Sequence, residues 1–114
     1  MQNSRAVTKY VRIPPRKARL AADLIRGLNV EDAAIQLTYS QLKGGKLLKK
    51  TLVSAIANAE TRFNIPRQKL KVKEVRVDCG PILKRSKSKA RGGMVPIMKR
   101  TSHFTVIVAP QEGE

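Results

Sequence analysis

Residues 80–104, GPILKRSKSKARGGMVPIMKRTSHF, are the stretch that decides how this chain folds. No acidic residue occurs from Gly80 to Gln111, and only scattered apolar residues lie among the cations. A segment of this composition cannot bury enough apolar surface to close a hydrophobic core of its own. Arg91-Gly92-Gly93 is the one good turn signal inside it. We therefore predict an extended β-hairpin over residues 80–103 that projects from a domain formed by the rest of the chain.

Strands are predicted on both sides of this hairpin, so that its base joins a sheet. Residues 69–78, KLKVKEVRVD, alternate between apolar and polar side chains, and the alternation slips by one residue at Lys73-Glu74, which predicts a β-bulge. Residues 103–109, HFTVIVA, predict a second strong strand with apolar side chains on both faces. Residues 5–13, RAVTKYVRI, predict a first strand because they are rich in β-branched and aromatic side chains.

Three helices are predicted between the first strand and residue 69. Pro14-Pro15 ends the strand and opens a helix, since proline is tolerated in a first helical turn, and Gly27 ends that helix. The apolar stripe of this helix is predicted to consist of Leu20, Ala21, Leu24 and Ile25. Asn29 is the predicted N-cap of a short second helix, and the longest helix is predicted from about Gly45 to Asn64. The length of 114 residues suits a single domain over residues 1–114.

The charge balance is the most extreme property of the sequence. Lys and Arg number 24 against 8 Asp and Glu, which gives a net charge of +16. Self-repulsion of this size destabilises a compact chain unless counter-charge is present, and nucleic acid is the polyanion that the balance favours. An anionic membrane would require an amphipathic helix, whereas the richest basic tract here is not helical. Because no stretch has the apolar length of a signal peptide or a membrane span, we expect an intracellular protein without a membrane partner.

Three cationic clusters without interspersed acids indicate nucleic-acid binding, although a single charge run is as often a solvated face. The first cluster consists of Arg5, Lys9, Arg12, Arg16, Lys17 and Arg19. The second cluster consists of Lys43, Lys46, Lys49 and Lys50. The third cluster lies in the predicted hairpin and consists of Lys84, Arg85, Lys87, Lys89, Arg91, Lys99 and Arg100. Because the charge sits on strands and loops as well as on helices, we expect a folded RNA whose phosphates are contacted from several sides.

Other functional classes find less support in the sequence. One Cys and one His, Cys79 and His103, cannot build a zinc finger, and the single Cys79 cannot form an intramolecular disulfide. No acid lies within several residues of His103 to orient it as a general base, so an RNA-modifying or RNA-cleaving enzyme is a weak alternative. A DNA-architectural protein, whose β-arm tip would insert Met94 or Pro96 into the minor groove, stays open as the other alternative. We expect no cofactor and no metal.

Four motifs, in their order and spacing, resemble a known protein family over nearly the whole chain. They are RIPPRKARLAADLIRG, SAIANAE, VDCGPILKRSKSKARG and KRTSHFTVIV. The chain resembles the bacterial family of protein twenty-two of the large ribosomal subunit. That resemblance implies an α+β fold, in which three helices pack on a small antiparallel β-sheet and a long basic β-hairpin protrudes. It also implies a structural constituent of the ribosome that is not an enzyme.

The resemblance further implies partners, a location and site residues. The implied partners are several domains of 23S rRNA, neighbouring large-subunit proteins such as four, seventeen and twenty, and the nascent peptide. The implied location is cytoplasmic, in the large (50S) subunit, with the globular part near the mouth of the peptide exit tunnel, the hairpin in the tunnel wall, and a role in early subunit assembly. Together with the clusters, the motif match predicts RNA contacts by Arg12, Arg16, Lys17, Arg19, Lys43, Lys46, Lys49, Lys50, Lys84, Arg85, Lys87, Lys89, Arg91, Lys99, Arg100, Thr101, Ser102 and His103. The predicted tunnel-lining tip consists of Lys89, Ala90, Arg91, Gly92, Gly93 and Met94.

Overall fold

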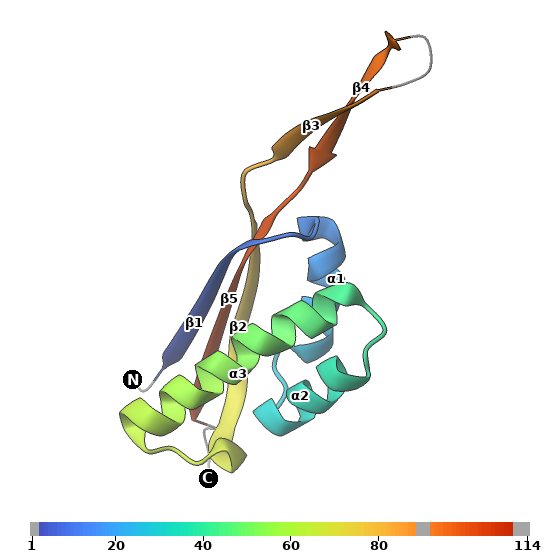
Figure 1. The fold of residues 1–114 in the computed structure, drawn as a ribbon. Coiled ribbons are helices and arrows are strands. Elements are labelled where there is room, and N and C mark those ends of the chain that lie inside the picture. Colours follow the sequence, from blue (N-terminus) through green and yellow to red (C-terminus); the bar gives the residue numbers. More distant parts are fainter. Residues whose placement is uncertain (1–2, 89–91, 111–114) are drawn as a thin grey trace.

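The computed structural model describes residues 3–88 and 92–110, in which a layer of helices covers one face of a β-sheet (Figure 1). The elements in chain order are β1 (Ser4–Val11), α1 (Pro15–Ile25), α2 (Val30–Tyr39), α3 (Lys43–Phe63), the short 3₁₀ helix η1 (Arg67–Lys69), β2 (Leu70–Cys79), β3 (Leu83–Ser88), β4 (Met94–Lys99) and β5 (Ser102–Pro110). The predicted α+β fold, with three α-helices on a small antiparallel sheet, is confirmed.

The sheet that carries the helices has three strands in the order β1-β5-β2, and both pairings are antiparallel. The central strand β5 is therefore hydrogen-bonded on both sides, which suits its apolar sequence. The register of β2 against β5 shifts between Val72 and Glu74, so the β-bulge predicted at Lys73-Glu74 is confirmed. The two strands that flank the predicted hairpin thus lie side by side in one sheet.

The hydrophobic core lies between this sheet and the helices. Phe104, Val106 and Val108 alternate along β5 and are fully buried, as the two-residue period of a strand requires. Leu48 and Leu52 of α3 meet them from the helix layer and are also fully buried. Each side chain of this size contributes about 1.5–3 kcal/mol when it leaves water. The core is therefore mainly aliphatic, and β1, β2, β5 and all three α-helices contribute to it around Phe104.

The ends of the helices follow signals that are visible in the sequence. Pro15 is the first residue of α1, and Gly27, just beyond that helix, adopts a φ of +81° that favours glycine. The side chain of Asn29 accepts a hydrogen bond of 3.0 Å from the backbone N–H of Glu31 and so caps α2, as predicted. Asn64 ends α3 with a φ of +55°, a conformation that Asn tolerates better than most residues.

The buried face of α1 differs from the predicted stripe. Leu20 and Leu24 are 57% and 44% exposed, so their placement in the core is wrong. The helix instead buries small residues, and the reason lies in Gly44 of α3. A Cβ atom at Gly44 would lie 3.2 Å from Cα of Ala18 and 3.1 Å from Cδ1 of Ile13. The helices therefore approach too closely for leucine between them, and α1 turns its alanine face inward. The buried residues of α1 are Pro15, Ala18, Ala21, Ala22 and Ile25.

Strands β3 and β4 form a separate antiparallel pair, from Leu83 opposite Lys99 to Ser88 opposite Met94. Figure 1 shows this pair extending away from the body, and the molecule measures 67 × 25 × 17 Å along its principal axes. Two hydrogen bonds join the linkers at its base: Gly80 N–H donates to the Thr101 carbonyl at 3.0 Å, and Thr101 Oγ1 donates to the Pro81 carbonyl at 2.7 Å. Residues 89–91 lie outside the described residues, so the predicted Arg91-Gly92-Gly93 turn and the hairpin boundaries 80–103 stay predictions.

The close approach of α1 and α3 gives a test of the core. Replacing Gly44 by Val adds side-chain atoms that must collide with Ala18 and Ile13, so we expect a loss of about 1–3 kcal/mol in the free energy of unfolding. Ala57→Val is the matched control, because it places the same side chain on the exposed face of the same helix. Urea unfolding measures both variants, and equal midpoints would contradict the packing described here.

Candidate nucleic-acid interface

The fold brings the first and second cationic clusters together beside the N-terminus of α1. Arg12 and Lys17, from the first cluster, and Lys43, from the second, line one hollow of about 400 Å³. Its remaining lining is largely apolar and consists of Ile13, Pro14, Leu20, Leu42 and Gly44. Leu20, whose exposure the predicted stripe on α1 did not indicate, therefore forms part of this surface. Cations around an apolar floor can bind phosphate at the rim and the flat face of a sugar or base within.

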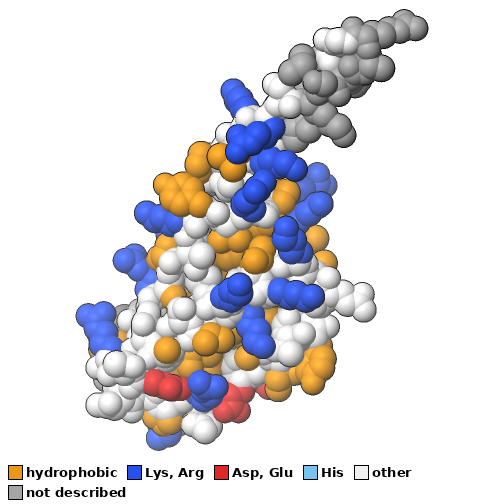
Figure 2. Space-filling view, viewed as in Figure 1, with side chains coloured by type: hydrophobic (Ala, Val, Ile, Leu, Met, Phe, Trp, Pro, Cys, Tyr) orange, Lys and Arg blue, Asp and Glu red, His pale blue; other side chains and the backbone are white. Residues whose placement is uncertain are grey.

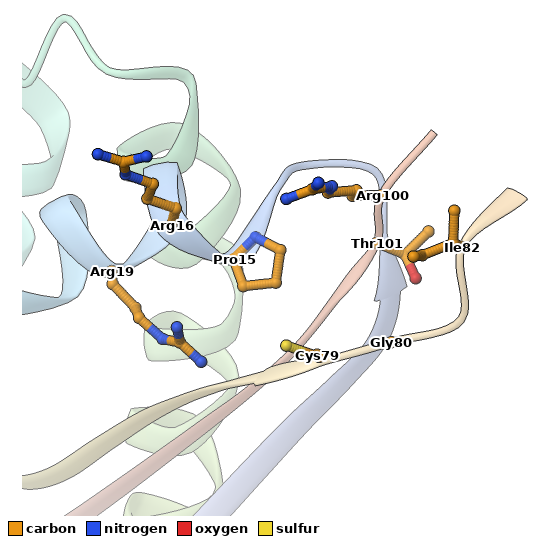
Figure 3. A pocket seen from close by; sticks show the side chains of 8 residues that line it. All are labelled: Pro15, Arg16, Arg19, Cys79, Gly80, Ile82, Arg100 and Thr101. Carbon is orange, nitrogen blue, oxygen red and sulfur yellow. The ribbon is translucent and has the colours of Figure 1, made fainter. Parts of the chain in front are cut away.

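A second hollow joins α1 to the base of the β3–β4 pair. Its volume is about 210 Å³, and its lining includes Arg16 and Arg19 of α1 together with Arg100, which precedes β5. Figure 3 shows Arg100 extending toward Pro15, and Arg19 reaching toward the strand that carries Cys79. The first cluster therefore meets the third cluster here, as it meets the second cluster in the larger hollow. Residues that lie far apart in the sequence thus form one continuous basic surface around α1.

The cations of this surface have no acidic partner among the described residues. The ion pairs in residues 3–88 and 92–110 join Arg26 to Asp23, Arg67 to Glu60, and Arg76 to Asp78, and none of these arginines was predicted to bind RNA. Figure 2 shows Lys and Arg side chains gathered where β3 and β4 leave the body, whereas the acidic side chains on this face lie near its opposite end. Without an internal counter-charge, these cations can attract an external polyanion at full strength.

The start of α3 adds a positive field to the second cluster. No acidic residue occupies its first turn, and no side chain caps it. Lys43, Lys46 and Lys50 are exposed there, and Lys49 is half-buried. The N-terminal end of a helix carries a partial positive charge, so cations at this place repel it and gain nothing from it. An anion bound here would interact favourably with both the helix and the lysines.

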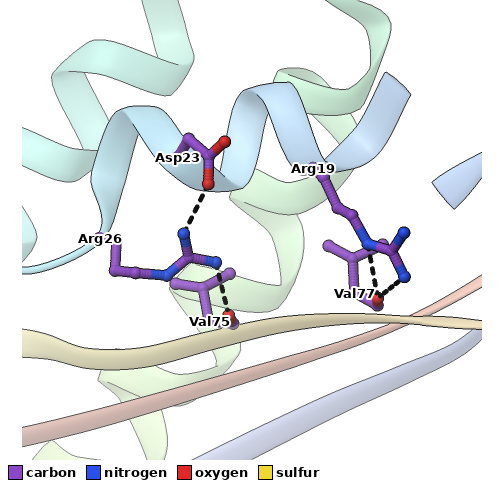
Figure 4. Close-up of polar contacts among 5 residues, drawn as sticks. All are labelled: Arg19, Asp23, Arg26, Val75 and Val77. Carbon is purple, nitrogen blue, oxygen red and sulfur yellow. Dashed lines mark hydrogen bonds and ion pairs between the residues drawn. The ribbon is translucent and has the colours of Figure 1, made fainter. Parts of the chain in front are cut away.

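Arg19 has a partner inside the protein, which distinguishes it from its neighbours. Its Nε and Nη2 atoms both donate to the Val77 carbonyl, at 3.3 and 3.0 Å (Figure 4). Arg26, the residue that follows α1, makes a similar contact, because its Nη2 donates to the Val75 carbonyl at 3.0 Å. Because β2 is an edge strand, these carbonyls would otherwise lack a partner in the sheet. The guanidinium of Arg19 therefore fastens α1 to the edge of the sheet.

Three residues that the motif match assigned to RNA contact are engaged within the fold. Thr101 and Ser102 are only 3% and 0% exposed, and their hydroxyls donate to the Pro81 and Ile13 carbonyls, the latter at 2.6 Å. Their side-chain hydroxyls are engaged in hydrogen bonds within the fold, and RNA contact by these two residues stays a prediction. They were predicted to contact RNA because they share the KRTSHFTVIV motif with the cations Lys99 and Arg100. His103 is half-buried, and its Nδ1 accepts a hydrogen bond of 3.1 Å from the Tyr10 backbone N–H.

The arms of the β3–β4 pair present their described cations to solvent. Lys84 and Arg85 of β3 are exposed, as are Lys99 at the end of β4 and Arg100 beyond it. The Nη1 of Arg85 donates to the Lys84 carbonyl at 3.1 Å, which orients that side chain along the arm. Gly92 and Gly93 are exposed as well. Lys89, Ala90 and Arg91 lie outside the described residues, as do the side chains of Lys87 and Met94.

Sequence reasoning missed one exposed aromatic residue beside this surface. Tyr10 lies between Lys9 and Arg12 of the first cluster, and its side chain is 64% exposed. The strand pattern that places Tyr10 in a predicted strand gives no sign of this exposure. Within residues 3–88 and 92–110, no group of three acidic, histidine or cysteine residues could hold a metal ion. The described helices also include none that is long and apolar enough to cross a membrane.

A comparison with known proteins agrees with this basic surface. A family model described as ribosomal protein L22p/L17e matches residues 6–109. The chain belongs to this family. Curated relatives named large ribosomal subunit protein uL22 include one from Protochlamydia amoebophila strain UWE25, which is 69% identical over 109 residues, covering 96% of this chain and 98% of the relative. Another, from Chlamydia pneumoniae, is 61% identical over 108 residues, covering 95% of this chain and 97% of the relative.

Membership of the L22p/L17e family decides between the functional classes that the sequence left open. The family is a structural component of the ribosome, so the chain is a ribosomal protein and not an enzyme. Its partners are therefore ribosomal RNA and other ribosomal proteins, and the DNA-architectural alternative loses its support.

Arg16 and Arg19 provide a matched pair that separates a ligand-binding cation from a structural one. Arg19→Ala removes both hydrogen bonds to the Val77 carbonyl, and we expect it to lower the free energy of unfolding by about 0.5–1.5 kcal/mol. Arg16→Ala removes an exposed charge on the same helix, so stability should stay within about 0.5 kcal/mol. Urea unfolding distinguishes them, and an equal loss in both variants would contradict the structural role of Arg19.

Proposed function

We propose that this chain is a structural, non-enzymatic constituent of the large ribosomal subunit that binds 23S rRNA and supports early subunit assembly. The observation that carries the proposal is the continuous basic surface around α1, whose cations lack acidic partners among the described residues. Membership of a ribosomal-protein family supports ribosomal RNA as the polyanion and a location in the cytoplasm, within the large subunit. By neutralising phosphates on several sides of one small body, the protein would hold separate rRNA segments together.

The β3–β4 pair suits a site that is too narrow for a globular domain. Two paired strands are only about 5 Å apart, and the pair extends the molecule to 67 Å in its long dimension. Its described cations are exposed, and the hydrophobic core includes none of the arm residues whose side chains the structure describes. We infer that the arm penetrates the RNA and lines the wall of the peptide exit tunnel, while the helical body stays near the tunnel mouth. The tip at residues 89–94 would then meet the nascent peptide.

Neighbouring proteins of the large subunit are the second class of partner. The body exposes several apolar side chains that a neighbour could cover, including Leu24 of α1 and Ile35 and Tyr39 of α2. The resemblance of the four sequence motifs names proteins four, seventeen and twenty as such neighbours. A body held by protein contacts on α2 and by RNA around α1 would be fixed from two directions.

Salt dependence of rRNA binding tests the proposed function directly. Each phosphate contact contributes about −0.7 to −0.9 to the slope of log K against log salt, so binding to protein-free 23S rRNA should weaken steeply as salt rises. Affinity that survives an excess of duplex DNA indicates a shaped rRNA site. Equal competition by duplex DNA would contradict the proposal, because charge alone would then drive binding.

The larger hollow gives a sharper version of this measurement. In the triple variant Arg12→Gln, Lys17→Gln and Lys43→Gln, the magnitude of the slope should fall by about 2–3, because three phosphate contacts are lost. The matched control is Lys69→Gln, Lys71→Gln and Lys73→Gln, which removes the same charge near the start of β2, at the other end of the sheet. If both variants change the slope equally, the cations around α1 have no special place in the interface.

Removal of the arm tests its independence from the body. We expect a chain that lacks residues 84–96 to keep a cooperative unfolding transition, because no residue of that segment belongs to the described core. Its affinity for 23S rRNA should fall, because exposed cations of the arm are lost. Circular dichroism and the same salt series measure the two properties. A trimmed chain that is unfolded would mean that the arm is part of the folding unit.

A further inference from the structure

Tyr10 has a backbone conformation that its side chain disfavours. Its φ is +60°, and among the described residues other than glycine only Asn64 shares a positive φ. For a residue with a bulky side chain, this left-handed conformation is strained by contact between Cβ and the backbone. Strain of this kind persists only where the surroundings enforce it, and it concentrates at functional sites. The strained backbone therefore marks Tyr10 as a candidate functional residue.

The strain arises from a β-bulge that changes the face on which Tyr10 lies. Thr8 pairs with Phe104 and Val11 pairs with Ser102, so Lys9 and Tyr10 together oppose the single residue His103. In an unbroken strand, Tyr10 would share a face with Thr8, whose hydroxyl contacts the Thr51 hydroxyl of α3 at 2.8 Å. Instead, its ring meets His103, which alternates with the core residue Phe104 and so lies on the helix-free face of the sheet. The bulge thus carries the ring out of the helix layer.

His103 contacts Tyr10 through both its backbone and its ring. The Nδ1 of His103 accepts the backbone N–H of Tyr10 at 3.1 Å, and the two rings lie edge to face with their centroids 5.0 Å apart. An edge-to-face contact uses only part of an aromatic ring. The side chain of Tyr10 accordingly remains 64% exposed. A flat ligand can therefore stack on the open part of the ring while the contact with His103 is kept.

The residues around Tyr10 indicate what that ligand is. Lys9 and Arg12 flank it in the sequence and are both exposed. A nucleotide satisfies all three side chains, because its base stacks on the ring and its phosphates bind the cations. We propose that Tyr10 is a stacking platform for an unpaired nucleobase of rRNA, with Lys9 and Arg12 holding the adjoining phosphates. This proposal rests on the proposed rRNA binding and adds a specific subsite to it.

Tyrosine fluorescence can report on this subsite alone. The chain contains two Tyr and no Trp, so Tyr39→Phe leaves Tyr10 as the single strong emitter. Stacking on a nucleobase quenches tyrosine emission. The matched control is Tyr10→Phe, which leaves Tyr39, 81% exposed at the end of α2, as the emitter. Both variants are titrated with the same concentrations of protein-free 23S rRNA, so that absorption of light by the RNA affects both emitters equally. We expect the emission of Tyr10 to fall well beyond that of Tyr39.

A change in affinity provides the second measurement. Tyr10→Phe keeps a ring and should keep the affinity for 23S rRNA, whereas Tyr10→Asn removes the ring and should lower the affinity by about tenfold to a hundredfold. Asn is chosen because it tolerates the left-handed backbone conformation, so the fold is retained. Equal quenching of the two emitters, with unchanged affinity of Tyr10→Asn, would overturn the stacking proposal and leave rRNA binding intact. Failure of the unmodified chain to bind 23S rRNA would overturn both.

Discussion

Uncompensated positive charge is the constraint on which the rest of this structure depends. A net charge of +16 on 114 residues opposes compaction, and the ion pairs of Asp23, Glu60 and Asp78 are with arginines outside the predicted RNA-binding set. The fold accommodates this charge by separating it from the core. Mainly aliphatic residues of the sheet and the three helices fill the interior, while cations of the three clusters line the hollows beside α1 and extend along the arm. The proposed binding of rRNA would supply the missing counter-charge through its phosphates.

The arm is a separate strand pair that two neighbouring strands of the sheet lead into, and this connection explains how an element without a core can be oriented. Strands β2 and β5 are neighbours in the body, and the chain leaves the one and enters the other through β3 and β4. Hydrogen bonds between Gly80, Pro81 and Thr101 join the two linkers where the arm begins. The buried hydroxyl of Ser102 fixes the start of β5 to the Ile13 carbonyl, next to α1. The direction of the arm and the basic surface around α1 are thereby set by one small group of contacts.

Sequence reasoning succeeded where a local signal has a single structural solution. The N-cap at Asn29, the glycine after α1 and the bulge at Lys73-Glu74 each follow from the preferences of a few neighbouring residues. It failed on the buried face of α1, because it favoured Leu20 and Leu24, which are larger and more hydrophobic than the alanines that are buried. The deciding residue is Gly44, which lies far along the chain and admits only small side chains opposite it. The burial of the Thr101 and Ser102 side chains was equally invisible in the sequence, because burial is a property of the whole fold.

The sequence by itself determined the elements, the excess of positive charge and the family to which the chain belongs. Those properties depend on composition and on short-range order, which a linear chain displays in full. Only the tertiary structure decided which cations share a surface, because Lys17 and Lys43 meet through the packing of α1 against α3. The tertiary structure also separated Arg19, which binds a sheet edge, from Arg16, which faces solvent. It turned Tyr10 outward as well, since the bulge that exposes the ring exists only in the pairing of β1 with β5.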